Sequence, residues 1–210
     1  MGTAVTDLRS YESQEEVVEE DRARANVYGL LANLFYGPPS EGLLRDIATI
    51  DSHVDRSPLA GTWHALQQAA RNAEPGALRQ EYDNTFITAG RAPVFLYGSV
   101  YQTGFLMDKP LAQLRDDLAK IGLARNREIG EPEDHISALC DVMRFLIIGA
   151  DEIPPSDIAV QREFFIRHIA PWYEQVCAAV ENAEQTDFYK KVAAFAKEFF
   201  DLEVQSFEIA

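Results

Sequence analysis

Cysteine and histidine are scarce in this chain of 210 residues, which holds two cysteines and four histidines. Cys140 and Cys177 each lie in an apolar run, and no Cys-x-x-Cys pair is present. A disulfide framework or a structural zinc site needs several such residues at close spacing, so the sequence argues against both. The two thiols are typical of small buried side chains in a reducing compartment.

Basic residues are also few. Nineteen Lys and Arg stand against thirty-four Asp and Glu, which gives a formal net charge of −15. Such a surface repels nucleic acid and attracts a basic partner. Acidity can also serve only to keep a protein soluble, and that alternative stays open. We therefore expect no binding to nucleic acid.

Long apolar runs are absent as well. The longest one covers residues 145–150, whereas a membrane-spanning helix needs about 20 residues. The first twenty residues contain five glutamates and lack the apolar core of a signal peptide. The sequence thus predicts a cytoplasmic protein without membrane insertion.

Apolar residues recur at helical spacing along most of the chain, which predicts an all-α fold. Ser13 and Glu16 have the spacing of a capping box, so a first helix is expected to start at Ser13. Pro171 is expected to interrupt or restart a later helix. Further helix starts are expected at three N-cap residues: Ser40, Ser156 and Thr186.

The helical pattern is lost over residues 87–109, where "TAGRAPVFLYGSVYQTGFLMDK" brings glycines, a proline and several aromatic residues. We expect an ordered apolar loop packed on helices, because residues 94–97 have no apparent partner strand. The polar residues 123–130 are the expected hinge between an N-terminal helical half, residues 1–122, and a C-terminal half, residues 131–210.

The stretch "GEPEDHISAL", residues 130–139, gathers three carboxylates, a proline and a histidine before a long apolar helix. Pro132 suits the first helical position, and acidic side chains in a first turn interact favourably with the helix dipole. This placement does not explain His135, because a cationic ring is disfavoured there. The apolar residues that follow define the inward face, so Asp134 and His135 are expected at the surface.

The residues around this cluster match no known catalytic or metal-binding motif. Glu131 and His135 are four residues apart and could share an ion, but no second histidine is near, and Asp134 projects in another direction. Gly-x-Ser-x-Gly and Gly-rich phosphate-binding motifs are missing too. We expect no catalytic residue, no metal and no cofactor. A metal-dependent hydrolase that uses His135 is the distant alternative.

Several segments resemble the TorD/DmsD family of redox-enzyme maturation chaperones, which is more distantly similar to NarJ. They are the Glu-Pro-x-Asp-His run at residues 131–135, "EYDNTF" followed by Pro93 and "YGSVY", and "QREFFIRHIAPWYEQV" with Gln161, Phe164, His168 and Trp172. "VYGLLANLFYGPP" near the N-terminus is similar to the first helix of the family. The match extends from about residue 22 to residue 200 and keeps the order of the family.

The resemblance implies a TorD-like helical bundle of two halves, a monomer or homodimer, that is not an enzyme. In the cytoplasm it would bind the catalytic subunit of a molybdopterin oxidoreductase and its twin-arginine leader peptide, assist cofactor insertion and delay export. A NarJ-like chaperone for a membrane-anchored reductase without an exported leader is the near alternative. The resemblance implies client contacts from these residues: Phe95, Tyr97, Ser99, Tyr101, Glu131, Pro132, Asp134 and His135.

A leader of this kind has a basic segment followed by an apolar one, so its receptor needs carboxylates beside exposed apolar surface. The acidic residues at 131–134 supply the carboxylates, and the aromatic loop that ends near Phe105 supplies the apolar surface. Ordinary core packing is the alternative for these aromatic side chains.

Overall fold

A computed structural model of the chain describes residues 5–50, 57–87, 92–124, 130–150 and 153–209, with side chains from residue 19 onward. Ten α-helices and one π-helical turn make up the regular structure of these residues, and no β-sheet occurs among them. None of the helices in the described ranges is both long and apolar enough to cross a membrane. The prediction of an all-α fold is confirmed.

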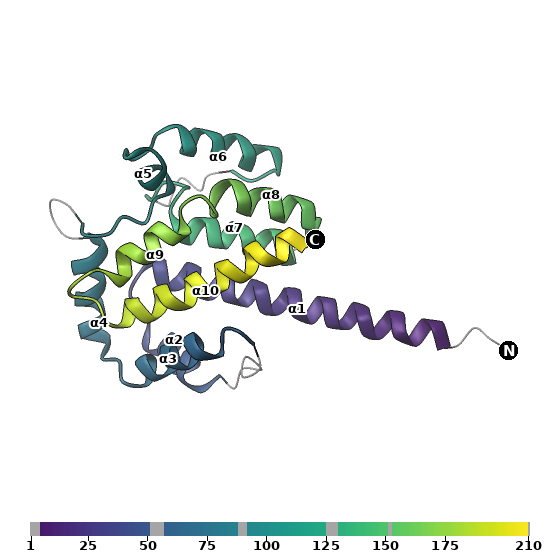
Figure 1. The fold of residues 1–210 in the computed structure, drawn as a ribbon, viewed down its shortest axis with the longest axis horizontal. Coiled ribbons are helices and arrows are strands. Elements are labelled where there is room, and N and C mark those ends of the chain that lie inside the picture. The colour runs from purple at the N-terminus through teal and green to yellow at the C-terminus, as the bar shows by residue number, and fades with distance from the viewer. Residues whose placement is uncertain (1–4, 51–56, 88–91, 125–129, 151–152, 210) are drawn as a thin grey trace.

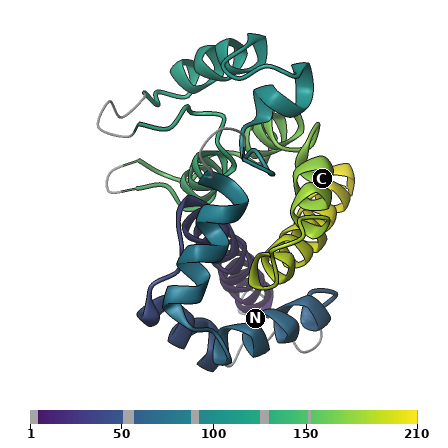
Figure 2. The same cartoon turned by 90° about the vertical axis from the view of Figure 1, so that its left-hand side faces the viewer.

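The helices are α1 (Val5–Tyr36), α2 (Glu41–Thr49), α3 (Ala60–Arg71), α4 (Pro75–Tyr82), α5 (Gly98–Thr103), α6 (Lys109–Lys120), α7 (Ile136–Ile148), α8 (Ile158–His168), α9 (Tyr173–Glu181) and α10 (Phe188–Ile209). The π-helical turn, Asp83–Ile87, directly follows α4. Figures 1 and 2 show the arrangement from two sides.

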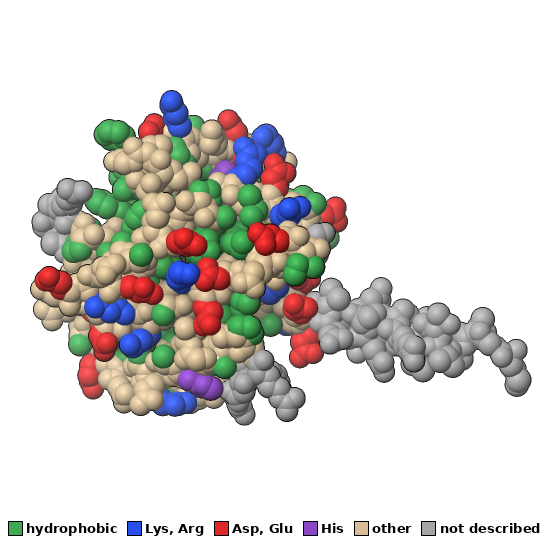
Figure 3. All heavy atoms as spheres, in the orientation of Figure 1, with side chains coloured by type: hydrophobic (Ala, Val, Ile, Leu, Met, Phe, Trp, Pro, Cys, Tyr) green, Lys and Arg blue, Asp and Glu red, His purple; other side chains and the backbone are tan. Residues whose placement is uncertain are grey.

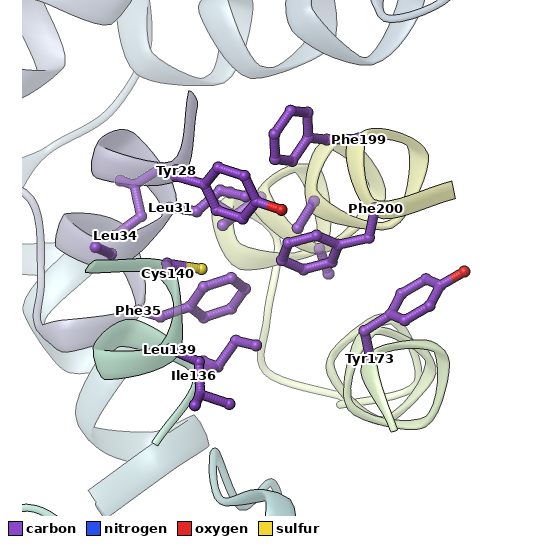
Figure 4. Packing of buried hydrophobic residues seen from close by; sticks show 14 of the residues in the cluster. Tyr28, Leu31, Leu34, Phe35, Ile136, Leu139, Cys140, Tyr173, Phe199 and Phe200 are labelled. Carbon is purple, nitrogen blue, oxygen red and sulfur yellow. The ribbon is translucent and has the colours of Figure 1, made fainter. Parts of the chain in front are cut away.

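Helices from distant parts of the sequence share one core. α1 packs mainly on α7, while α10 packs on α9 and α3. Tyr28 of α1, Cys140 of α7 and Phe200 of α10 are fully buried and lie close together (Figure 4). Each fully buried large apolar side chain stabilises the fold by about 1.5–3 kcal/mol. Both predicted halves therefore contribute residues to this core. Residues 125–129 of the expected hinge lie outside the described residues. The division into halves stays a prediction.

Charge is dispersed over the face of the molecule that Figure 3 shows. In Figure 3 acidic side chains are interspersed with basic and apolar ones on the face that carries α9 and α10. The net charge of −15 is thus not gathered into one patch on that face.

The predicted start of the first helix is wrong. α1 begins at Val5 and continues through Ser13. No glycine or proline lies between these residues, so nothing interrupts the helix at the serine. Ser40 was placed correctly, because its hydroxyl caps α2 by accepting the N–H of Leu43 at 3.2 Å.

The N-caps expected at Ser156 and Thr186 are also wrong. α8 begins at Ile158, so its N-cap is Asp157. The Thr186 hydroxyl instead shares a hydrogen bond of 2.9 Å with the hydroxyl of Thr85. At the start of α10 the Glu81 carboxylate accepts the N–H of Tyr189 at 2.8 Å. Pro171 lies between α8 and α9, as its expected role requires.

Residues 87–109 are not a continuous loop, because they contain α5. Six residues are too few to show a helical period in sequence. The alternative of a strand reduces to one isolated bridge between Tyr97 and His135. α5 and α6 form the upper edge of the molecule in Figure 1, where α6 packs on α5 and α8. This edge borders the candidate site.

Candidate functional site

Residues 131–135 form a turn that leads into α7. The N–H of His135 donates to the carbonyl of Pro132 at 3.2 Å, and the helix begins at Ile136. Pro132 therefore precedes the helix and does not occupy its first position, so that prediction is wrong. The carboxylates of the turn also precede the first turn of α7, so the prediction that they occupy it is wrong.

Backbone hydrogen bonds to residues 96–98, which lie at the start of α5, hold this turn in a non-helical conformation. Gly98 donates its N–H to the carbonyl of Asp134, and Ile136 donates its N–H to the carbonyl of Leu96, both at 2.9 Å. The Asp134 carboxylate also accepts the N–H of Ser99 at 2.8 Å. These three bonds join two regions more than thirty residues apart in sequence.

The prediction that Asp134 and His135 are surface groups is wrong. Their exposed fractions are 3% and 5%. The Asp134 carboxylate faces the N–H of Ser99 in α5, and the His135 ring packs on the ring of Tyr97. One carboxylate oxygen of Asp134, Oδ1, is buried and has no hydrogen-bond partner among the described residues. In this conformation Asp134 positions Ser99, and its carboxylate is out of direct reach of a client.

His135 is the N-cap of α7. Its Nδ1 accepts the N–H of Ser137 at 3.2 Å, so the proton of the neutral ring resides on Nε2. Burial lowers the pKa of His135 from 6.5 to about 4. The ring is therefore neutral at pH 7, which removes the conflict between a histidine and the positive end of a helix.

A pocket of about 260 Å³ opens beside this turn. The Tyr97 hydroxyl donates to the Glu131 carboxylate, and its ring meets the His135 ring edge to face at 5.1 Å. Burial and the bond to Glu131 raise the pKa of Tyr97, so its hydroxyl stays protonated. The lining residues are Tyr36, Tyr82, Phe86, Ile87, Leu96, Tyr97, Gly130, Glu131 and His135. The pocket thus combines aromatic and aliphatic side chains with one exposed carboxylate.

The wall opposite the turn comes from α1 and α4. The Tyr82 hydroxyl donates to the carbonyls of Phe35 and Tyr36 at 3.1 and 2.9 Å. These are carbonyls at the C-terminal end of α1, so one phenol both fixes the tyrosine ring and caps a helix. Burial raises the pKa of Tyr82 to about 12. Tyr36 and Ile87 are each 60% exposed and lie at the rim.

Trp172, at the start of α9, packs against α5. A Cβ atom on Gly98 would lie 2.9 Å from the indole nitrogen, so only glycine fits there without displacement. The indole N–H donates to the carbonyl of His168 at 2.7 Å, and the ring stacks on Tyr101 at 5.6 Å. His168 in turn binds Asp117 of α6 at 2.9 Å. Three of the segments that resemble the TorD family therefore meet at α5: residues 97–101, 131–135 and 161–176.

Three of the eight predicted contact residues line the pocket: Tyr97, Glu131 and His135. Pro132, Ser99 and Asp134 are buried behind it, Tyr101 packs on Trp172, and Phe95 is half-buried. Sequence reasoning missed the contribution of Tyr36, Tyr82, Phe86 and Ile87. The run "EYDNTF" held a signal for two of them, but Tyr36 precedes the helix-ending Gly37 and carries no such signal.

Among the described residues, no group of three or more His, Cys, Asp and Glu side chains could hold a metal ion. Both cysteines are buried. Burial raises the pKa of Cys177 to about 12 and that of Cys140 well above its usual range. Neither thiol is in the ionised form that acts as a nucleophile.

Comparison with known proteins assigns the chain to a family. Residues 53–178 match the family model described as nitrate reductase delta subunit. The chain belongs to this family. The chain is 28% identical to the chaperone protein TorD of Vibrio cholerae (strain ATCC 39315), over 83% of this chain and 86% of that protein. It is 27% identical to TorD of Vibrio atlanticus, over 61% of this chain and 63% of that one.

A solved structure has the same fold. The crystal structure of a protein described as a redox enzyme maturation protein from Archaeoglobus fulgidus matches with a TM-score of 0.55, over 85% of this chain and 92% of that one, at 20% identity. The predicted membership of the TorD/NarJ group is confirmed by these matches. The relatives are named chaperones, which points to a chaperone and not to an enzyme.

Proposed function

We propose that this family member is a cytoplasmic maturation chaperone for a molybdopterin oxidoreductase, and that it binds the twin-arginine leader of that client in the pocket beside α7. The observation that carries the proposal is the composition of this pocket. One exposed carboxylate lies among aromatic and aliphatic side chains where the family segments converge. A basic peptide followed by an apolar stretch suits such a surface.

Glu131 is the group suited to an arginine. Its carboxylate accepts one bond from Tyr97 and keeps acceptor positions for the two parallel N–H groups of a guanidinium. The rings of Tyr36 and Phe86 lie in the same pocket and offer faces on which a planar cation can stack.

His135 is suited to the backbone of the peptide. The Nε2–H of its neutral ring can donate to a peptide carbonyl. Because the ring carries no charge at pH 7, it adds this donor without repelling a cationic leader. The net charge of −15 adds long-range attraction.

A NarJ-like role is the second candidate, since the matching family is described as nitrate reductase delta subunit. In that role the client would be a membrane-anchored reductase without an exported leader. The chaperone would then bind the folded part of its client and show no affinity for an isolated leader.

Calorimetric titration with a synthetic leader separates these roles. The probe is a peptide with two consecutive arginines followed by an apolar stretch. We expect the wild-type protein to bind it, and Glu131→Gln to weaken binding roughly tenfold or more, as loss of a charged hydrogen bond does. Glu208→Gln, which removes an exposed carboxylate at the far end of α10, is the control and should bind as wild type does. Absence of binding to the wild-type protein would favour the NarJ-like role.

A further inference from the structure

We propose that Phe105, Leu106 and Met107 form the surface on which the apolar segment of the leader docks. These three residues, the apolar tip, connect α5 to α6. The inference rests on the proposed function and adds to it a second contact surface outside the pocket.

The apolar tip is exposed to an unusual degree. The exposed fractions of Phe105, Leu106 and Met107 are 71%, 47% and 62%. Single exposed apolar side chains are ordinary, but three consecutive large ones leave a contiguous apolar surface in water. Such surfaces mark sites of interaction with another apolar partner.

The tip is held in one conformation. Gly104, the C-cap of α5, has φ of 82°, and Met107 has φ of 60°, a left-handed conformation that a side chain disfavours. The N–H of Met107 donates to the Ser99 hydroxyl at 3.1 Å, and Ser99 is fully buried. A fixed surface binds a partner without the entropic cost of ordering a mobile loop.

Ser99 also joins the tip to the pocket. Its backbone N–H donates to the carboxylate of Asp134 at 2.8 Å, and Asp134 adjoins His135 in the pocket wall. Two hydrogen bonds through one serine therefore fix the tip relative to the site proposed for the leader arginines.

Charge favours a leader over a lipid surface as the occupant. The chain carries −15, which opposes approach to an anionic bilayer but favours a basic peptide. A leader presents its basic and apolar segments in series, which matches a carboxylate pocket joined to an apolar tip.

The test compares two peptides and two double variants. One peptide is the leader described above, and the other has its apolar stretch replaced by serine and glycine. The test variant is Phe105→Ser with Met107→Ser. The control is Ile153→Ser with Ile158→Ser, which changes two residues of comparable exposure, 55% and 46%. Phe105→Ser alone serves if the double variant fails to fold.

We expect the wild-type protein and the control variant to bind the full leader at least tenfold more tightly than the polar version. The tip variant should lose this difference and retain the affinity for the polar version. A tip variant that keeps the full difference would overturn the inference while leaving the proposed function intact. Failure of the wild-type protein to bind either peptide would overturn both. Unchanged leader binding with lost self-association or lost binding to anionic vesicles would assign the tip to another occupant.

Discussion

At the scale of single residues, His135 has two roles, one in the fold and one in the pocket. Its Nδ1 caps α7, and its ring forms part of the pocket wall. The neutral state that makes the cap possible is a result of burial. A cap of this kind titrates, so the stability of the fold depends on pH through His135.

The free energy of unfolding should fall as the solution becomes more acidic than the normal pKa of histidine. Because the pKa of folded His135 is about 4 and its unfolded value is 6.5, its contribution is complete above pH 6.5 and is lost as the pH falls towards 4. Over that range the loss is about 3 kcal/mol. His135→Asn, whose amide can still cap, should lack this loss, so the free energy of unfolding of the wild-type protein, measured in urea, should fall by this amount relative to that of the variant between pH 7 and pH 4. A difference independent of pH would mean that the ring is not held neutral.

Asp134 is expected to act through position and not through charge. Asp134→Ala leaves the buried N–H of Ser99 without an acceptor, which should cost about 1–3 kcal/mol in the free energy of unfolding. Asp134→Asn keeps an acceptor oxygen and should retain most of the stability and the leader affinity. Denaturant unfolding and peptide titration measure the two effects. An Asn variant that is stable yet fails to bind the leader would instead support the direct contact between Asp134 and the leader that the family resemblance implies.

The sequence indicated the turn that borders the pocket but not the burial of its side chains. Glu131, Tyr97 and His135 were identified, and all three line the pocket. The burial of Asp134 depends on pairing with residues 96–98, which no local pattern contains. Periodicity placed Asp134 on the outer side of a helix that begins only after it.

At the scale of elements, α5 shows what periodicity leaves out. It has six residues, and contacts from distant segments fix it: Asp134 at its start and Trp172 beneath it. The start of α10 is similar, because Glu81 from α4 binds its first N–H groups. The long helices with regular apolar stripes were predictable, whereas boundaries set by tertiary contacts were not.

Gly98→Ala should displace α5 and destabilise the protein. The added methyl group would lie 2.9 Å from the Trp172 indole, and such overpacking costs about 1–3 kcal/mol. Leader affinity should fall as well, because Tyr97 precedes the displaced residue. Thermal unfolding measures the first effect. Gly61→Ala in α3 is the matched control, since its methyl group meets no atom within 4 Å and should be neutral or stabilising. Equal stability of the two variants would contradict the close packing of Gly98 on Trp172.

At the scale of the whole molecule, composition and periodicity sufficed for the all-α fold. They could not show that α1 packs on α7 and α10 on α3, because an apolar helix face does not specify which other helix covers it. The expected halves, residues 1–122 and 131–210, therefore contribute to one core. Their independence as folding units, the cytoplasmic location and the oligomeric state remain predictions.

Leader binding should weaken as ionic strength rises. The charge of −15 attracts a basic peptide over a distance that salt shortens, from a Debye length of about 10 Å at 0.1 M to about 3 Å at 1 M. Titrations across this range should show a several-fold loss of affinity, with a residual part from apolar contacts. An affinity that does not change with salt would mean that the acidity serves only solubility.

Photo-cross-linking from the leader tests most directly whether its arginines occupy the pocket. A peptide with a photoreactive residue next to the arginine pair is irradiated with the wild-type protein, and the adducts are mapped by mass spectrometry. We predict adducts within residues 82–87, 96–101 or 130–137, which unlabelled leader suppresses and Glu131→Gln reduces. Adducts that are instead confined to the groove between α3, α4 and α10, lined by Ala69, Leu78 and Phe188 among others, would contradict the proposed site.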